Sequence, residues 1–182
     1  MPKAIGMVEF NSMARGIFSA DKMVKVSEVD IVTCSPTCPG KYIAIVHGDV
    51  SAVEDSVKMG EQTADEYLVD SIVIPNVHQD VFPAITGTTM PDKIGAVGII
   101  ESFSIATMII VADAVLKAAN VEPIELRLGN GLGGKALFVF TGDLSSVESG
   151  IKAGQNIAID KSLLVNSEII ASPSNLLVSN LL

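Results

Sequence analysis

Residues 4–30 read AIGMVEFNSMARGIFSADKMVKVSEVD, and this pattern returns 92 residues later in residues 96–122 as AVGIIESFSIATMIIVADAVLKAANVE. Ten of the 27 aligned positions are identical. Residues 40–60 align in the same way with residues 134–154, at an offset of 94 and with nine identities in 21 positions. Two copies of one small domain explain both alignments, because self-similarity at a fixed spacing is the mark of a repeat.

The repeat divides the chain into two domains of similar length. We expect the first domain to span residues 1–80 and the second to span residues 93–182. A linker at about residues 79–94 joins them, because this stretch contains two prolines and a Gly-Thr-Thr sequence, which are typical of loops.

Within each copy, the spacing of apolar residues predicts the order β-α-β-β-α-β. The elements expected in copy one are a strand at residues 5–10, a helix built on Met13, Ile17, Ala20 and Val24, a short strand at 31–33 followed by a proline-rich loop, a strand at 42–46, a helix opened by a capping box at 51–54, and a strand at 68–74. Copy two repeats the capping box at 145–148. This order predicts an α+β fold, in which two tandem copies each take the ferredoxin-like (split β-α-β) arrangement.

Charge and composition exclude two classes of partner. The chain carries 12 basic and 21 acidic residues, a net charge of −9, and has no Lys/Arg run, so we expect no nucleic-acid partner. The longest apolar stretch, residues 104–116, is interrupted by Asp113 and is too short to cross a bilayer, so we expect no membrane partner. Two cysteines cannot form the disulfide framework of a small secreted protein, and the N-terminus lacks the apolar core of a signal peptide. These features favour a cytoplasmic protein.

Several motifs of both copies resemble the shell domain of bacterial microcompartments. They are Ala4-Ile5-Gly6-Met7-Val8-Glu9, Ala20-Asp21-x-Met23-Val24-Lys25, Gly40-Lys41, Gly48-Asp49-Val50 and Val73-Ile74-Pro75-x-x-His78. The resemblance implies an unpermuted tandem shell protein, not an enzyme, located in the shell of a microcompartment in the cytoplasm. It further implies a homotrimer that forms a pseudohexameric tile and abuts other shell proteins through Lys25 and Lys117. Asn76 and Val77 depart from the Arg-Pro that is usual in the closing motif.

A narrower resemblance concerns the tandem shell proteins of propanediol-utilisation compartments. It rests on Thr37-Cys38-Pro39-Gly40-Lys41, Val69-Asp70-Ser71 and Gly131-Leu132-Gly133-Gly134-Lys135. It implies one 4Fe-4S cluster per trimer at the central pore, with three Cys38 ligands and an exogenous ligand on the fourth iron. Pro39, Gly40, Gly133 and Gly134 would then belong to the pore loops. The implied role is electron transfer across the shell, with an encapsulated or cytoplasmic redox enzyme as partner.

Cys38 is also open to plainer interpretations. A lone cysteine is most often a small buried apolar residue, but Pro36 and Pro39 keep this one out of a helix. A 4Fe-4S cube has a threefold axis along its body diagonal, so three symmetric thiolates match three of its irons. A zinc ion held by three thiolates and a water is the competing metal. Cys34 falls at the end of an expected strand, and an inert structural role is the simplest interpretation.

Three functions stay open on the sequence. The first is a shell tile with a redox cluster, and the second is a shell tile whose metabolite-conducting pore is merely lined by Cys38. The third is an enzyme with Cys38 as nucleophile, which is disfavoured because no base accompanies the thiol. Residues 129–135 match a phosphate-binding loop in outline, but Ala136 stands where a hydroxyl is needed and a strand is expected to follow. Glu9 and Glu101 occupy equivalent positions in the two copies, which argues for an architectural role.

Overall fold

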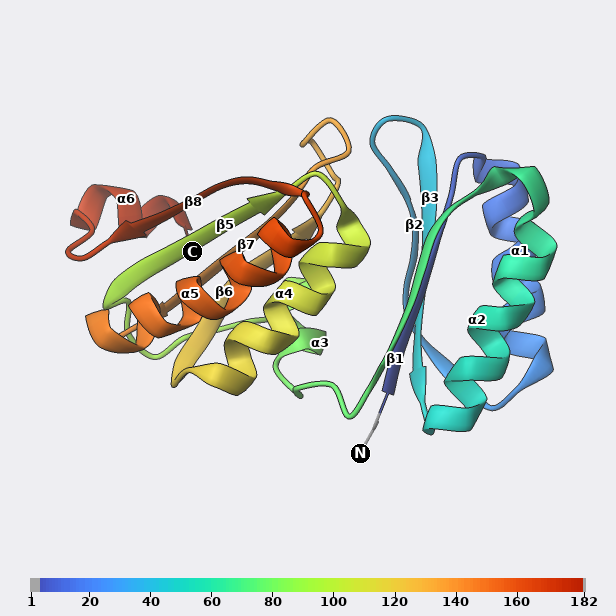
Figure 1. Ribbon diagram of the computed structural model, residues 1–182, viewed down its shortest axis with the longest axis horizontal. Coiled ribbons are helices and arrows are strands. Elements are labelled where there is room, and N and C mark those ends of the chain that lie inside the picture. Colours follow the sequence, from blue (N-terminus) through green and yellow to red (C-terminus); the bar gives the residue numbers. More distant parts are fainter. Residues whose placement is uncertain (1–3, 182) are drawn as a thin grey trace. The chain divides into compact units, whose positions relative to one another are not determined.

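The computed structural model describes residues 4–181 and divides into two compact units between Val77 and His78. Each unit contains a four-stranded antiparallel sheet with two long helices, and within each unit both helices cover the same face of the sheet (Figure 1). The α+β fold and the tandem repeat predicted from the sequence are confirmed.

The first unit follows the predicted order. Its elements are β1 (Ala4–Phe10), α1 (Met13–Val26), β2 (Val29–Thr37), β3 (Lys41–Gly48), α2 (Val50–Ala64), a short 3-10 helix η1 (Asp65–Tyr67) and β4 (Leu68–Pro75). The strands lie in the order β2-β3-β1-β4, so the first strand sits between the third and the last. This crossing is the split β-α-β arrangement.

The second unit repeats this topology and adds two short helices. Its elements are α3 (Val81–Thr86), β5 (Ala96–Ser102), α4 (Ile105–Ala118), β6 (Val121–Leu128), β7 (Ala136–Gly142), α5 (Leu144–Asp160), β8 (Leu164–Ile170) and α6 (Asn175–Leu181). The strand order β6-β7-β5-β8 matches that of the first unit. The stretch expected as a linker therefore includes a helix, α3, which packs against β6.

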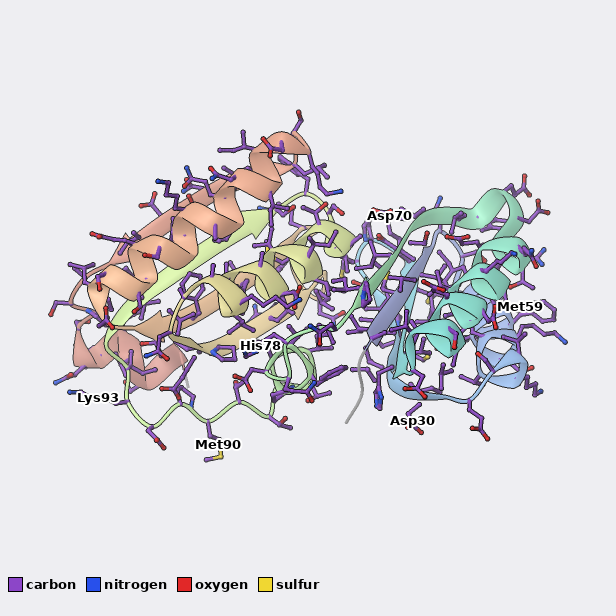
Figure 2. The ribbon with its side chains drawn as sticks, turned by 60° about the horizontal axis from the view of Figure 1, so that its bottom comes forward. Asp30, Met59, Asp70, His78, Met90 and Lys93 are labelled. Carbon is purple, nitrogen blue, oxygen red and sulfur yellow. The ribbon has the colours of Figure 1, made fainter. Side chains whose placement is uncertain are left out.

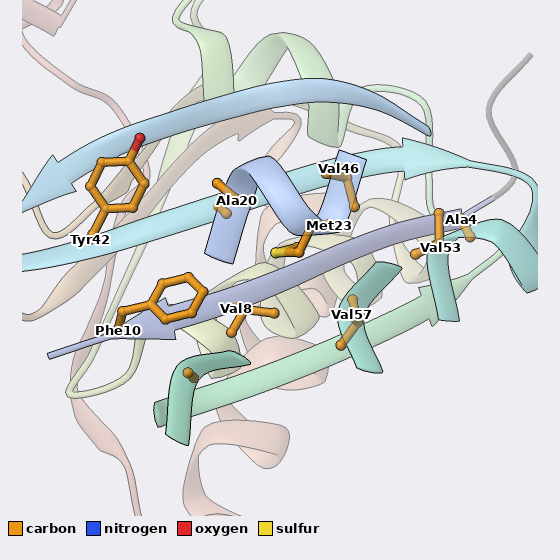
Figure 3. Close-up of a cluster of buried hydrophobic side chains, with 11 residues drawn as sticks. Ala4, Val8, Phe10, Ala20, Met23, Tyr42, Val46, Val53 and Val57 are labelled. Atoms are coloured by element: carbon orange, nitrogen blue, oxygen red, sulfur yellow. The ribbon is translucent and has the colours of Figure 1, made fainter. Parts of the chain in front are cut away.

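The core of the first unit lies between its sheet and its two helices (Figure 3). Alternate residues of β1, among them Val8 and Phe10, meet Met23 of α1 and Val57 of α2, and each is almost completely buried. Burying one such side chain stabilises the fold by about 1.5–3 kcal/mol. Gly6 allows α2 to approach β1 closely, because a Cβ there would lie 2.5 Å from a methyl group of Val57.

Two local predictions are wrong. The proline-rich segment after residue 33 is not a loop, because β2 continues to Thr37; Pro36 is tolerated since β2 is an edge strand. The capping boxes are also not used as predicted. The N-cap residues are Asp49 and Asp143, two positions before the expected serines, so Ser51 and Ser145 already lie in the first turn of their helices.

Among the described residues, no helix is both long enough and apolar enough to cross a membrane.

Candidate functional site

Cys38 lies at the tip of the hairpin that joins β2 to β3. Residues 38–40 form the turn, with Cys38 half-buried and both Pro39 and Gly40 exposed. Gly40 takes a positive φ of 73°, a conformation that other residues adopt only with strain. The predicted pore-loop residues of copy one thus form one compact turn, and its thiol lies outside the apolar core.

An ion pair fixes the base of this hairpin. The ammonium of Lys41, the first residue of β3, lies 3.0 Å from Oε1 of Glu9 on the neighbouring strand β1. Glu9 is only 3% exposed, so its charge is largely shielded from water. The second copy repeats the arrangement, in which Lys135 pairs with Glu101. The architectural role expected for the two glutamates is therefore an ion pair with the lysine that closes each loop.

The loop of the second copy is shaped by glycine. Residues 129–135 join β6 to β7, and Gly133 and Gly134 both have positive φ. Leu132 stands at the position that aligns with Cys38, so this loop offers no thiol. Of the two equivalent loops in one chain, the first therefore offers a thiol, that of Cys38, as a candidate metal ligand.

Cys34 lies in a different environment from Cys38. It is in the middle of β2, opposite Ala44 of β3, and packs against the core of the first unit. Burial raises the pKa of its thiol, although a hydrogen bond with the backbone of Ile45 opposes this shift. The simple structural role predicted for Cys34 agrees with this environment.

One chain does not hold a complete metal site in the part that the structure describes. Across residues 4–181, no three side chains of His, Cys, Asp or Glu gather closely enough to bind an ion. A metal or cluster on Cys38 would therefore take its remaining ligands from other chains or from solution.

The predicted tile-edge lysines form a second matched pair. Lys25 and Lys117 each occupy the last turn of their helix, α1 or α4. Each ammonium pairs with the aspartate one turn earlier, Asp21 at 2.6 Å and Asp113 at 2.7 Å. The sequence analysis missed these pairs, although the identical Asp-x-x-x-Lys spacing in both copies is a direct signal for them. The strand directions place Lys25 at the opposite end of its unit from the Cys38 hairpin.

The two copies differ in the exposure of aligned apolar residues. On α1, Ile17 is 58% exposed and Phe18 is 49% exposed, whereas Ile109, which aligns with Ile17, is fully buried on α4. The sheets show the reverse. Met7 and Ile43, on the face of the first sheet that the helices leave open, are buried. Their counterparts Ile99 and Leu137 are only half-buried. Ile17 and Phe18 of α1, and Ile99 and Leu137 of the second sheet, are thus apolar side chains that stay at least partly exposed.

Comparison with known proteins agrees with this architecture. The model of the BMC domain family matches residues 4–77 and again residues 96–173. The chain is 39% identical to the bacterial microcompartment shell protein PduT of Citrobacter freundii, over 95% of this chain and 94% of that protein. It is 26% identical to the carboxysome assembly protein CcmO of Synechococcus elongatus, over 85% of this chain but 60% of that protein. A crystal structure of a microcompartment protein from Desulfitobacterium hafniense superposes with a TM-score of 0.94 at 44% identity, covering 98% of this chain and 99% of that one.

Proposed function

This chain belongs to the BMC domain family, carries its domain twice, and is a bacterial microcompartment shell protein with a structural rather than an enzymatic role. We propose that three copies close into a pseudohexameric tile with a 4Fe-4S cluster at its centre. The cluster would pass electrons across the shell to or from a redox enzyme, encapsulated or cytoplasmic. Other shell proteins would surround the tile.

Two different apolar surfaces of one chain support the trimer. One is the exposed face of α1 with Ile17 and Phe18, and the other is the half-buried sheet face of the second unit with Ile99 and Leu137, so copies of the chain can join through them. Such a head-to-tail contact uses two different surfaces, and it closes into a ring when the rotation per chain divides a full turn. Three chains supply six domain copies, the number that a pseudohexamer needs.

Mutation of the α1 surface tests the trimer. Ile17→Glu puts a charge on the exposed apolar face, so we expect light scattering to change from three times 19.0 kDa to the mass of one chain. Leu176→Glu, at an 82% exposed position on α6, is the matched control and should leave the trimer intact. A trimer that survives Ile17→Glu unchanged contradicts this interface.

The position of Cys38 supports the cluster. A thiolate is the ligand that iron–sulfur clusters prefer, and Cys38 presents its thiol from a turn rather than from the core. If three such turns meet on a threefold axis, they supply three thiolates with the symmetry of the cube's body diagonal. The fourth iron would then take an exogenous ligand.

The two free cysteines of the chain give the test and its control. After anaerobic reconstitution, the wild-type protein should hold iron and sulfide equal to one 4Fe-4S cluster per trimer, with a broad brown absorbance. Cys38→Ser should lose this iron while remaining a trimer, because a hydroxyl is a poor iron ligand. Cys34→Ser should keep it. Equal iron loss in both variants, or retention in Cys38→Ser, would contradict the proposal.

The alternative is a tile whose metabolite-conducting pore is only lined by Cys38. The observation that favours it is that one chain brings together no metal-binding group within the described residues 4–181. Under this alternative the reconstituted trimer holds no iron. Zinc in place of iron and sulfide would indicate the competing metal site, with three thiolates and a water as ligands.

A further inference from the structure

We propose that Asp113 acts as a latch that fastens the joint between the two domain copies to the second unit. This inference is independent of the proposed cluster, since it concerns the connection between the copies and not the Cys38 hairpin. The segment in question, residues 78–91, is called the strap below.

The carboxylate of Asp113 binds two separate parts of the chain. Its Oδ1 accepts a hydrogen bond of 2.8 Å from the backbone N–H of His78, the first residue of the second unit. Its Oδ2 accepts one of 2.7 Å from the ammonium of Lys117 on the same helix. Asp113 is only 7% exposed, so its carboxylate lies largely out of water, whereas His78 is half-buried and the Lys117 side chain is 41% exposed. A buried carboxylate needs such partners, and a partly buried amide that loses its acceptor costs free energy unless water replaces the bond.

The repeat provides an internal comparison for this aspartate. Asp21 occupies the same place on α1 and pairs with Lys25, but its side chain is 48% exposed. The helix ion pair is thus common to both copies. The hydrogen bond with the joint is the feature that belongs to copy two, so it is not needed to build the helix.

Further bonds shape the chain around His78. Its carbonyl oxygen accepts from the N–H of Val81 at the start of α3, and its ring Nδ1 accepts from the N–H of Asp80. The chain thus changes direction at His78, whose backbone N–H donates to Asp113. From there it continues past α3 to Met90, and Lys93 follows beyond its end (Figure 2).

A hydroxyl near the other end of the strap binds β6. Thr89 Oγ1 donates to the backbone carbonyl of Ile124 on β6. Between the two ends, the strap buries the small side chains of Val81 and Ala84. It also borders a surface pocket of about 200 Å³ whose opposite wall is formed by Glu122 and Pro123 of β6. Phe82, Pro83 and Ile85 are half-buried, but residues 86–88 and Met90 are exposed, and a segment with less buried apolar surface than the sheet core opens before the rest of its domain.

The latch sets the length of the tether between the copies. With His78 held, only Asn76 and Val77 lie between the end of β4 and the first fixed residue of the second unit. With the strap released, the tether extends to the start of β5 at Ala96. A flexible segment of about 20 residues has a root-mean-square span of roughly 25 Å. Asp113 would therefore decide whether the two copies are joined by a short link or by a long flexible one.

Hydrogen exchange followed by mass spectrometry on the full-length trimer tests the latch. In Asp113→Ala, peptides covering residues 78–91 should exchange at least tenfold faster than in the wild type, while β5 and β7 keep their protection. Asp113→Asn keeps an acceptor oxygen and should recover part of the protection. Asp21→Ala removes the equivalent ion pair in copy one and should leave residues 78–91 unchanged.

Two results would overturn the proposal. Wild-type exchange of residues 78–91 in Asp113→Ala would mean that the strap is held without the carboxylate. A uniform increase across the whole second unit would mean that Asp113 supports the fold generally and is no latch.

Discussion

The ammonium of Lys41 and the carboxylate of Glu9 lie 3.0 Å apart at the base of the hairpin that carries Cys38. Lys41 begins β3 immediately after the turn, and Glu9 belongs to the neighbouring strand β1. The pair therefore ties the turn to the centre of its sheet. Lys135 and Glu101 do the same for the glycine-rich loop of the second copy, but there Glu101 is more exposed than Glu9.

Glu9→Gln should destabilise the protein more than Glu101→Gln. In the first variant Lys41, whose side chain is 24% exposed, loses its counter-charge, so the free energy of unfolding should fall by about 1–3 kcal/mol. In the second variant the effect should be smaller, because Lys135 is 38% exposed and water can solvate its ammonium when the carboxylate is lost. Thermal unfolding of both variants under one set of conditions checks this order, and equal or reversed midpoints would contradict it.

The two cysteines should differ in reactivity. Burial raises the pKa of the Cys34 thiol, and the thiolate is the form that reacts with alkylating reagents. In metal-free folded protein at pH 8, iodoacetamide should therefore modify Cys38 before Cys34. In denatured protein the two rates should converge, which is the control. Mass spectrometry locates the label, and faster labelling of Cys34 in the folded protein would contradict its burial.

The same shift gives a pH dependence of stability with a definite sign. Folding disfavours the ionised form of Cys34, so its contribution to stability is intact below the ordinary thiol pKa of 9.0 and is lost as the pH rises beyond it. Cys34→Ala should reduce the loss of stability between pH 8 and pH 10. Chemical denaturation at several pH values measures the effect, and identical slopes for the variant and the wild type would contradict it.

The fold was largely predictable because the repeat supplies two independent versions of each pattern. Apolar spacing located the two long helices and the four strands of copy one, and the second copy supported the assignments that fall within residues 4–30 and 40–60. The course of β2 beyond Thr33 was not predictable by local rules, since Pro36 reads as a loop residue and is accepted only because its strand lies at the edge of the sheet. The capping boxes failed because Asp49 and Asp143 also match the N-cap preference.

The candidate site was predictable in part. Pro36 and Pro39 correctly excluded a helix at Cys38, and the equivalent positions of Glu9 and Glu101 correctly indicated a structural role for both carboxylates. The bonding partners of Glu9 and Asp113 could not be predicted from the sequence, because Lys41 is 32 residues from Glu9 and His78 is 35 residues from Asp113. Contacts between residues this distant in sequence depend on strand register and helix packing, which no local pattern encodes.

Lys25 and Lys117 should matter for contacts between tiles and not for the tile itself. The Lys25–Asp21 pair is exposed on both sides, and exposed pairs contribute little to stability; Asp113 is buried but keeps its bond from the His78 amide when Lys117 is replaced. The double variant Lys25→Ala/Lys117→Ala should remain a trimer but fail to form ordered sheets in electron micrographs. The matched control is Lys58→Ala/Lys152→Ala, an exposed and repeat-related pair on α2 and α5. Sheets formed by the first double variant, or lost in the second, would contradict this prediction.

The N-cap of α5 should stabilise its helix more than that of α2, and this advantage should disappear in acid. Asp143 accepts hydrogen bonds from the hydroxyl of Ser145 and from the backbone N–H and hydroxyl of Ser146, and these hold its pKa at about 2. Asp49, at the same position of α2, makes no such cap bond.

A carboxylate with a depressed pKa stabilises the folded state above its unfolded pKa, here 3.8, and loses that contribution as the pH falls towards 2. Asp143→Ala should therefore lower the thermal midpoint at pH 7, and the difference from the wild type should shrink between pH 4 and pH 2. Asp49→Ala should have a smaller effect at pH 7, because only the favourable charge at the helix N-terminus is lost. A deficit of Asp143→Ala that stays constant down to pH 2 would mean that the side chain acts by packing and not as a charged cap.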